Sequence, residues 1–385
     1  MAKSRGLKNM TPEEKRRYRA AKKRRRRMQI MAELGLIVII AIVAFSIVSG
    51  LIKGRGNGEE TEDTETVETA EVDNDSFLTK LFRKDEGLKV ASQPIELPEQ
   101  PVEVEVEDTL PEIKAYSAQE TENTAYVWQE SVGSDYAILI NNDTDEIVAK
   151  KNSFDTIYPA SMTKVMTVLT AVNHMTPEQL DDSVAISHEA VDYAYAHDCS
   201  TSGFSENEVV TVRDLLYGTI LPSGGDAAIQ LAMYVGGDVD SFVALMNEDL
   251  AAMGLSETTH FTNPVGIYAD DHYSTVYDIA MIMEAALDNE TLYPVMTSHT
   301  YDSTPTTEHP EGITISNWFL RRIEDKDIPG TIEGAKTGYV VQSGNCAVSS
   351  LISESGTEYI CCTGKASGSW PCIEDHVAIY SGFVN

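Results

Sequence analysis

The pattern of apolar and polar positions divides the chain into an N-terminal region without globular character and a patterned region that begins near residue 126. The first region contains a run of nineteen residues, 34–52, with no charged side chain. A helix rises about 1.5 Å per residue, so this run just crosses the roughly 30 Å hydrocarbon core of a bilayer. The run therefore predicts a transmembrane helix. A cleavable signal peptide is the alternative, although no small-residue cleavage site of the A-x-A type follows the run.

Beyond residue 126 the pattern predicts strands at both ends and helices between them. Residues 136–141 and 146–150 flank a turn-rich Asn-Asp-Thr-Asp segment, which predicts a β-hairpin. Apolar stripes at helical spacing predict helices from Ser161, from Thr211 to near Pro222, from about Asp226, over 240–253 and over 275–288. Three further strands are predicted over 334–341, 345–352 and 358–363. The fold class is therefore α+β: one antiparallel sheet that holds both chain ends, flanked by helices, with a helical subdomain.

Charge is distributed unevenly over these segments. The predicted cytoplasmic tail, 1–33, carries net +10, whereas residues 53–125 carry net −13 and residues 126–385 carry net −29 of the chain's total of −32. The positive-inside rule keeps the basic tail in the cytoplasm and places everything after the span outside. The acidic, proline-containing composition of 53–125 predicts an extended stalk or linker. The domain over 126–385 has nine cations among thirty-eight acids, too few to form a basic face for nucleic acid.

The five cysteines do not predict a disulfide framework, because their number is odd and no Cys-x-x-Cys occurs. Buried single thiols are the favoured interpretation, and the adjacent Cys361 and Cys362 would face opposite sides of a strand. The eight histidines are scattered and no His-Glu-x-x-His is present, so no metal and no cofactor are predicted. His260 and His272 are interpreted as structural or surface residues, and the Asp270-Asp271 pair as part of a solvated loop.

The strongest chemical signal is Tyr-Pro-Ala-Ser-Met-Thr-Lys at 158–164. On a helix that begins near Ser161, Ser161 and Lys164 lie one turn apart on the same face. A serine hydroxyl is a weak nucleophile unless a base takes its proton, and a lysine can be that base if burial or a neighbouring cation lowers its pKa. Ser-x-x-Lys alone also occurs by chance, in which case the serine caps a helix and the lysine is exposed.

Two further motifs strengthen this interpretation. Leu-Pro-Ser-Gly-Gly-Asp at 221–226 places Ser223 on a tight turn between two helices, where it could relay a proton; a simple turn is the alternative. Gly-Ala-Lys-Thr-Gly-Tyr at 334–339 places Lys336 and Thr337 on a strand, where a cation and a hydroxyl could bind a carboxylate. Gly338 would let a substrate backbone approach this strand, although the strand could also be an ordinary edge strand. Ser-x-x-Lys, a second serine and Lys-Thr-Gly, in this order, form the signature of penicillin-binding proteins and class A β-lactamases.

On these three motifs, and on the Asn-Pro-Val-Gly segment that opens residues 263–282, the region 126–385 resembles the serine-type D-alanyl-D-alanine carboxypeptidases, the low-molecular-mass penicillin-binding proteins. The resemblance implies the penicillin-recognising serine-transferase fold and cleavage of D-Ala-D-Ala on peptidoglycan stem peptides, with β-lactam antibiotics as covalent inhibitors. It also implies roles for individual residues: Ser161 as the acylated nucleophile, Lys164 as its base, Ser223 as proton relay, Lys336 and Thr337 as carboxylate ligands, and the amides of Ser161 and Tyr339 as the oxyanion hole.

One residue departs from the pattern of the family. Its second motif usually reads Ser-x-Asn, and Gly225 stands where the asparagine would contact the substrate backbone and the neighbouring lysine. The leading hypothesis is a membrane-anchored, single-pass carboxypeptidase with its catalytic domain outside the cell membrane. Gly225 keeps open a catalytically weak peptidoglycan-binding or scaffold protein of the same fold. A β-lactamase is the other alternative, but the expected Glu-x-x-Leu-Asn loop is missing: Glu290-Thr-Leu-Tyr-Pro comes nearest and lacks the asparagine.

Overall fold

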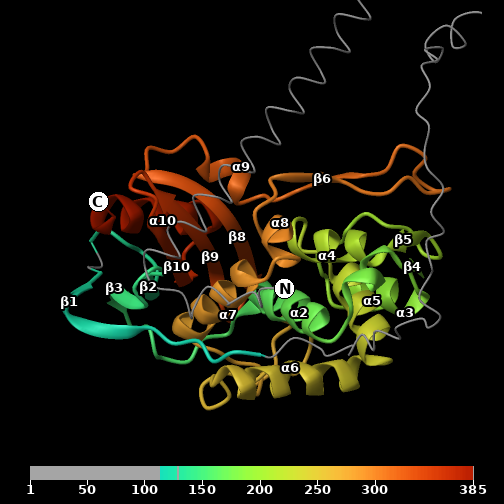
Figure 1. Cartoon of the computed structure of the whole chain (residues 1–385), viewed down its shortest axis with the longest axis horizontal. Helices are drawn as coiled ribbons and strands as arrows, with labels where there is room; N and C mark the ends of the chain where they lie inside the picture. The colour runs from blue at the N-terminus through green and yellow to red at the C-terminus, as the bar shows by residue number, and fades with distance from the viewer. Residues whose placement is uncertain (1–112, 128–129, 385) are drawn as a thin grey trace, which may run out of the picture. The chain divides into compact units, whose positions relative to one another are not determined.

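The computed structural model describes residues 113–127 and 130–384 (Figure 1). Their centre is a six-stranded sheet in the order β1-β3-β2-β10-β9-β8. All neighbours pair antiparallel except β1 and β3, which run parallel. The strands are β1 (Gln119–Tyr126), β2 (Tyr136–Asn141), β3 (Glu146–Lys151), β8 (Gly330–Val340), β9 (Gly344–Ser353) and β10 (Glu358–Ala366).

Alternation along the strands creates two hydrophobic cores, one on each face of the sheet. On β2, Ile138 and Ile140 belong to one core, whereas Ala137 and Leu139 belong to the other. Cys361 and Cys362 are likewise divided between the two cores, as the alternation predicts. The first face is covered by α7 (Val276–Asp288) and the second by α10 (Ser369–Phe383). A sheet buried on both faces gives its strands a rigid register.

Most of the remaining helices build a helical half beside β8 (Figure 1). The helix α2 packs on α7, α5, α4 and α6, so it is the central helix of this half. Its elements are the 3-10 turn η2 (Ala160–Met162), α2 (Thr163–Asn173), the 3-10 turn η3 (Pro177–Asp181), α3 (His188–Ala196), α4 (Val212–Ile220), α5 (Gly225–Gly236), α6 (Val239–Met253) and α8 (Leu292–Met296). The short helix α9 (Leu320–Ile323) instead packs on β8 and α10. Two short hairpins complete the helical half: β4 (Ser183–Ala185) with β5 (Val209–Thr211), and β6 (Thr300–Asp302) with β7 (Thr314–Ser316).

The predicted helix boundaries are confirmed where a capping residue marks them. Thr211 and Asp214 form a reciprocal capping box at the start of α4. Thr275 caps α7 by accepting a hydrogen bond from the Asp278 amide. Gly254 ends α6 with a φ of 81°, a left-handed conformation that glycine adopts without steric cost.

Three elements differ from the expectation. Strand β1 begins at Gln119, before the domain boundary predicted at residue 126, and its pairing with β3 is parallel. Its side chains are largely exposed, so the apolar alternation that would announce a strand is missing. The chain ends in α10 instead of a strand; Pro371 lies in the first helical turn, where no amide donor is needed. The helix α3 was not predicted, since only Ala190 and Ala194 are buried on it.

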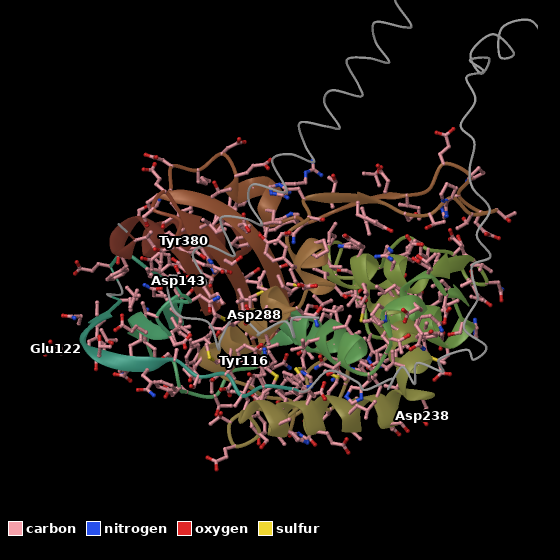
Figure 2. The ribbon with its side chains drawn as sticks, in the orientation of Figure 1. Tyr116, Glu122, Asp143, Asp238, Asp288 and Tyr380 are labelled. Atoms are coloured by element: carbon pink, nitrogen blue, oxygen red, sulfur yellow. The ribbon has the colours of Figure 1, made fainter. Side chains whose placement is uncertain are left out.

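Most acidic side chains of the described residues are not buried, although several, such as Asp214 and Asp226, lie in the interior. Glu122 on β1 and Asp238, which caps α6, are exposed at the periphery, whereas Tyr380 is buried against the sheet (Figure 2). Across residues 113–127 and 130–384, no helix is both long and apolar enough to cross a bilayer. The predicted span at 34–52, the tail at 1–33 and most of the stalk at 53–125 lie outside the described residues.

Candidate active site

The first motif forms a tight entry into the central helix. Pro159 leads into η2, which contains Ser161, and α2 follows from Thr163. Ala160 has a φ of 47°, an unusual conformation for a residue with a side chain. Such strain, of order 1–3 kcal/mol, persists only where surrounding contacts hold it, and it is frequent at functional sites.

Two glycines allow other segments to approach this turn closely. A Cβ on Gly338 of β8 would lie 2.8 Å from the Pro159 carbonyl oxygen, and one on Gly266 would lie 1.9 Å from the Ala160 carbonyl oxygen. Neither approach leaves room for a side chain. Gly338 thus brings the third motif against the first.

Lys164 is buried beneath the nucleophile, with 2% of its surface exposed. Its Nζ donates to Ser161 Oγ at 3.0 Å and to the Val265 carbonyl oxygen at 2.9 Å. Burial lowers the pKa of Lys164 from 10.5 to about 8, although the negative charge of Asp226 opposes the shift. About one molecule in ten then carries the free amine at pH 7, a form that can accept the serine proton.

The carbonyl that holds Lys164 belongs to a loop that Asn263 organises. Asn263 Oδ1 accepts hydrogen bonds from the amides of Val265, Gly266 and Ile267 at 3.2, 2.7 and 2.9 Å. From α2, Thr167 donates its hydroxyl to the Pro264 carbonyl at 2.6 Å. The loop is therefore fixed both internally and against the helix that carries the lysine.

The two histidines near this loop are structural, as their interpretation from the sequence proposed. His272 is buried, accepts from the Thr262 amide at 3.0 Å and contacts Thr163 Oγ1 at 2.9 Å. Burial lowers the pKa of His272 to about 3, so the ring stays neutral. His260 contacts the Asp271 carbonyl, and Asp270 and Asp271 are exposed, as expected of a solvated loop.

The second and third motifs meet through Lys336. Its Nζ donates to Ser223 Oγ and to the Thr337 carbonyl oxygen, both at 2.7 Å. Ser223 has a φ of 64°, a strained turn that directs its hydroxyl to the lysine. Lys336 is 1% exposed, and burial, followed by the nearby Lys164, holds its pKa well below 10.5.

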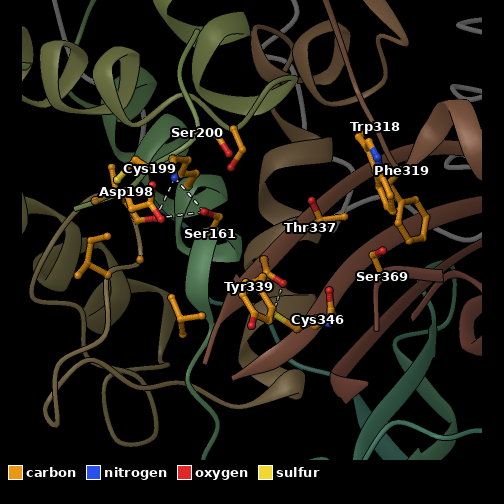
Figure 3. Close-up of a pocket in the computed structure, with 18 of the residues that line it drawn as sticks. Ser161, Asp198, Cys199, Ser200, Trp318, Phe319, Thr337, Tyr339, Cys346 and Ser369 are labelled. Carbon is orange, nitrogen blue, oxygen red and sulfur yellow. Dashed lines mark hydrogen bonds between the residues drawn. The ribbon is translucent and has the colours of Figure 1, made fainter. Parts of the chain in front are cut away.

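These motifs open onto one pocket with a volume of about 340 Å³ (Figure 3). That volume suits a small peptide end. Of the predicted site residues, six line it: Ser161, Lys164, Ser223, Thr337, Gly338 and Tyr339. Lys336 and Gly225 do not line it. The Lys336 ammonium is buried against Ser223, and the carboxylate contacts expected of Lys336 and Thr337 stay predictions.

Sequence reasoning missed several pocket residues. On one side, the loop after α3 contributes Cys199 and its neighbours, and on the other Trp318 and Ser369 lie beyond β8 (Figure 3). These residues belong to segments without periodic patterning, so no local signal marked them. Cys199 is also the exception to the prediction of buried thiols: all five cysteines are free, and only Cys199 is partly exposed. Over the described ranges, no group of three or more His, Cys, Asp and Glu side chains could hold a metal.

Together the sheet, the central helix and the Ser-Lys pair define the class of penicillin-recognising serine-transferase folds. Within that class, the chain belongs to the D-alanyl-D-alanine carboxypeptidase family, whose model matches residues 121–362. That match begins on β1 and contains all three motifs.

Individual relatives agree with this assignment. The chain is 29% identical over 238 residues to D-alanyl-D-alanine carboxypeptidase DacF of Bacillus subtilis, covering 61% of this chain and 58% of the relative. It is 31% identical over 243 residues to the D-alanyl-D-alanine carboxypeptidase of Streptomyces sp. strain K15, covering 61% of this chain and 81% of the relative. The crystal structure of the Streptomyces K15 DD-transpeptidase superposes with a TM-score of 0.59 at 27% identity, over 66% of this chain and 97% of that one. The chain thus spans little more than half the length of DacF and most of the length of the two Streptomyces proteins.

Proposed function

We propose that this protein is a serine D-Ala-D-Ala carboxypeptidase that removes the terminal D-alanine from peptidoglycan stem peptides through an acyl-Ser161 intermediate. One observation carries the proposal: the Lys164 amine lies 3.0 Å from the Ser161 hydroxyl and is buried enough to act as its base. Membership of the family supports the choice of substrate.

The first half of the reaction forms the acyl-enzyme. Ser161 Oγ bonds to the carbonyl carbon of the penultimate D-alanine while Lys164 takes the hydroxyl proton. The peptide C–N bond then breaks: Ser223, which is hydrogen bonded to Lys336, gives its proton to the leaving amine and regains one from the Lys164 ammonium, which returns to the free amine. The amides of Ser161 and Tyr339 would stabilise the oxyanion, since both residues line the pocket.

Water then hydrolyses the ester and returns Ser161 to its free form. Thr337 would hold the terminal carboxylate of the substrate, with the positive charge of Lys336 beneath it. β-Lactam antibiotics would acylate the same serine. Glu290, the sequence's nearest match to a deacylating glutamate, lies between α7 and α8 and does not line the pocket. Slow loss of a bound penicillin is therefore expected, and rapid loss would favour a β-lactamase.

We further propose that residues 34–52 anchor the protein in the cell membrane, with the basic tail in the cytoplasm and the catalytic domain outside. The uncharged run and its basic flank support this arrangement. Recovery of the intact chain from the soluble fraction of lysed cells would contradict it.

The proposed activity is tested by intact-mass analysis of the full chain incubated with benzylpenicillin, beside Ser161→Ala. An adduct on the unmodified chain alone, and release of D-alanine from a D-Ala-D-Ala peptide that Ser161→Ala abolishes, are the expected results. A folded protein that binds the peptide but forms no adduct would favour the scaffold alternative.

A further inference from the structure

The backbone conformation at residue 225 does not require glycine. Gly225 is the first residue of α5 and has no positive φ, so a side chain would be tolerated conformationally. A Cβ there would instead meet the Cys199 side chain, at 2.7 Å from its Cβ and 3.0 Å from its Sγ, with Ala194 Cβ next at 3.6 Å. The obstacle to a side chain at residue 225 is therefore another side chain.

Its neighbour Gly224 provides the contrast. A Cβ on Gly224 would lie 2.7 Å from the Gly218 carbonyl oxygen and 2.8 Å from the Ser202 amide nitrogen. Those atoms are backbone and cannot be removed by substitution. A Cβ on Gly224 would also lie 2.8 Å from Asp226 Oδ1, but only at Gly225 are all three of the nearest atoms side-chain atoms.

The loop that presents Cys199 is fixed to the start of α5. The Gly225 amide donates to the Ser200 carbonyl at 2.7 Å, and Asp226 accepts from the Ser202 amide at 2.8 Å and from its hydroxyl at 2.7 Å. At its other side, the Cys199 amide donates to the Ala194 carbonyl of α3 at 2.9 Å. These bonds hold the thiol at a set position against Gly225.

Cys199 lines the pocket with Ser161 and Lys164, whereas Gly225 does not (Figure 3). We propose that Cys199 takes the place of the missing side chain at residue 225 and is a specificity-determining residue for the substrate segment that lies beside Lys164. This inference rests on the proposed function and deepens it, because it names the residue that forms this wall of the acylation site.

A thiol in place of an asparagine amide changes the chemistry of this side of the pocket. An asparagine amide offers two donors and an acceptor to a peptide backbone, whereas a thiol is a weak donor and behaves as a small apolar group. Burial raises the pKa of Cys199 above 9.0 even though Lys164 opposes the shift, so the thiol is neutral at pH 7. Compared with a pocket that has asparagine at residue 225, this pocket is therefore expected to bind the substrate backbone less tightly on this side. It is also expected to accept stem-peptide analogues with more apolar groups there.

The first test exchanges the two positions in the full chain. Gly225→Asn alone should slow acylation by benzylpenicillin by about tenfold or more, because its side chain meets Cys199. Adding Cys199→Gly should restore the rate to within about threefold and lower the KM for a D-Ala-D-Ala peptide while kcat changes less. Gly224→Ala is the matched control, and Cys199→Gly should not rescue it. Failure of the double variant to recover, or equal rescue of the control, would overturn the proposal.

The second test needs no substitution at residue 225, so it stands if those variants fail to fold. Iodoacetamide forms a thioether with a thiol and releases iodide and a proton, and Cys199 is the partly exposed target among five cysteines. Acylation by benzylpenicillin should slow labelling of Cys199 by about tenfold or more, since the acyl group then covers the wall. In Ser161→Ala the antibiotic should leave labelling unchanged.

Intact-mass analysis distinguishes failure of this inference from failure of the proposed activity. An acyl adduct whose Cys199 is labelled at the unprotected rate would overturn this inference and leave the proposed activity standing. No adduct at all would contradict the proposed activity, and the inference would fall with it.

Discussion

Asn263→Ala should impair Lys164 as the base by loosening the loop that holds Lys164 in position. The substitution removes the oxygen that accepts from the amides of Val265, Gly266 and Ile267. Val265 and Gly266 are buried, and each buried amide left without an acceptor costs about 1–3 kcal/mol, so the free energy of unfolding should fall by about 2–6 kcal/mol. The Val265 carbonyl, which binds Lys164 at 2.9 Å, would then lose its fixed position.

The effect on chemistry follows from this loss of position. A misplacement of about 1 Å in a catalytic group can cost about a hundredfold in rate, so acylation should slow by about ten- to a hundredfold. The assay is the rate of the benzylpenicillin mass shift, measured beside urea unfolding at the same pH. Asn289→Ala is the matched control, because Asn289 also accepts from two amides, those of Thr291 and Leu292, but lies away from the pocket.

The control should lose about 1–2 kcal/mol of stability and keep its acylation rate. If Asn263→Ala lost stability and still acylated at the rate of the unmodified chain, the loop would not position the lysine. The reasoning from the Val265 carbonyl would then be refuted.

Three further predictions concern the Lys164 base, the close approach at Gly338 and the buried His376. The acylation rate should rise with pH and level off above about 8, because burial lowers the pKa of Lys164 to about 8 and the free amine is the active form; a rate that falls over pH 6–9 would contradict this role. Gly338→Ala should slow acylation at least about tenfold with a stability loss of about 1–3 kcal/mol, because its Cβ would lie 2.8 Å from the Pro159 oxygen. Burial lowers the pKa of His376 from 6.5 to about 3, so its contribution to folding is present above pH 6.5 and is lost as pH falls toward 3. That loss amounts to about 3 kcal/mol between pH 6.5 and 4, and urea midpoints of His376→Gln should change less over this range.

The sequence was sufficient to predict an element wherever residues within that segment determine its structure. The stripe on α2, the capping box at Thr211 and the alternation on β2 each depend on neighbours within a few residues, so the sequence predicted these elements correctly. The pairing of Ser161 with Lys164 also follows from one helical turn.

The features that could not be predicted from the sequence depend on contacts between distant segments. Strand β1 is held by its pairing with β3 and not by an apolar face, so its polar sequence was assigned to the stalk. The Val265 carbonyl is a backbone group, which no motif specifies. Cys199 gains its position from bonds to α5, and its relation to Gly225 appears only once both are placed in space.

The electrostatics of the site also explain why so acidic a domain can keep a neutral lysine. Most of the acids lie at the surface, where water and salt screen them beyond about 10 Å at 0.1 M ionic strength. The buried acid Asp226 raises the pKa of Lys164, but desolvation is the larger effect and the net direction is downward. Burial lowers the pKa of Lys336 as well, and the positive charge of Lys164 lowers it further, so a proton on one lysine disfavours a proton on the other. Because desolvation is insensitive to salt, the midpoint of the pH profile of acylation should stay near 8 from low to high ionic strength, and a shift of a full unit would show that surface charge sets the base instead.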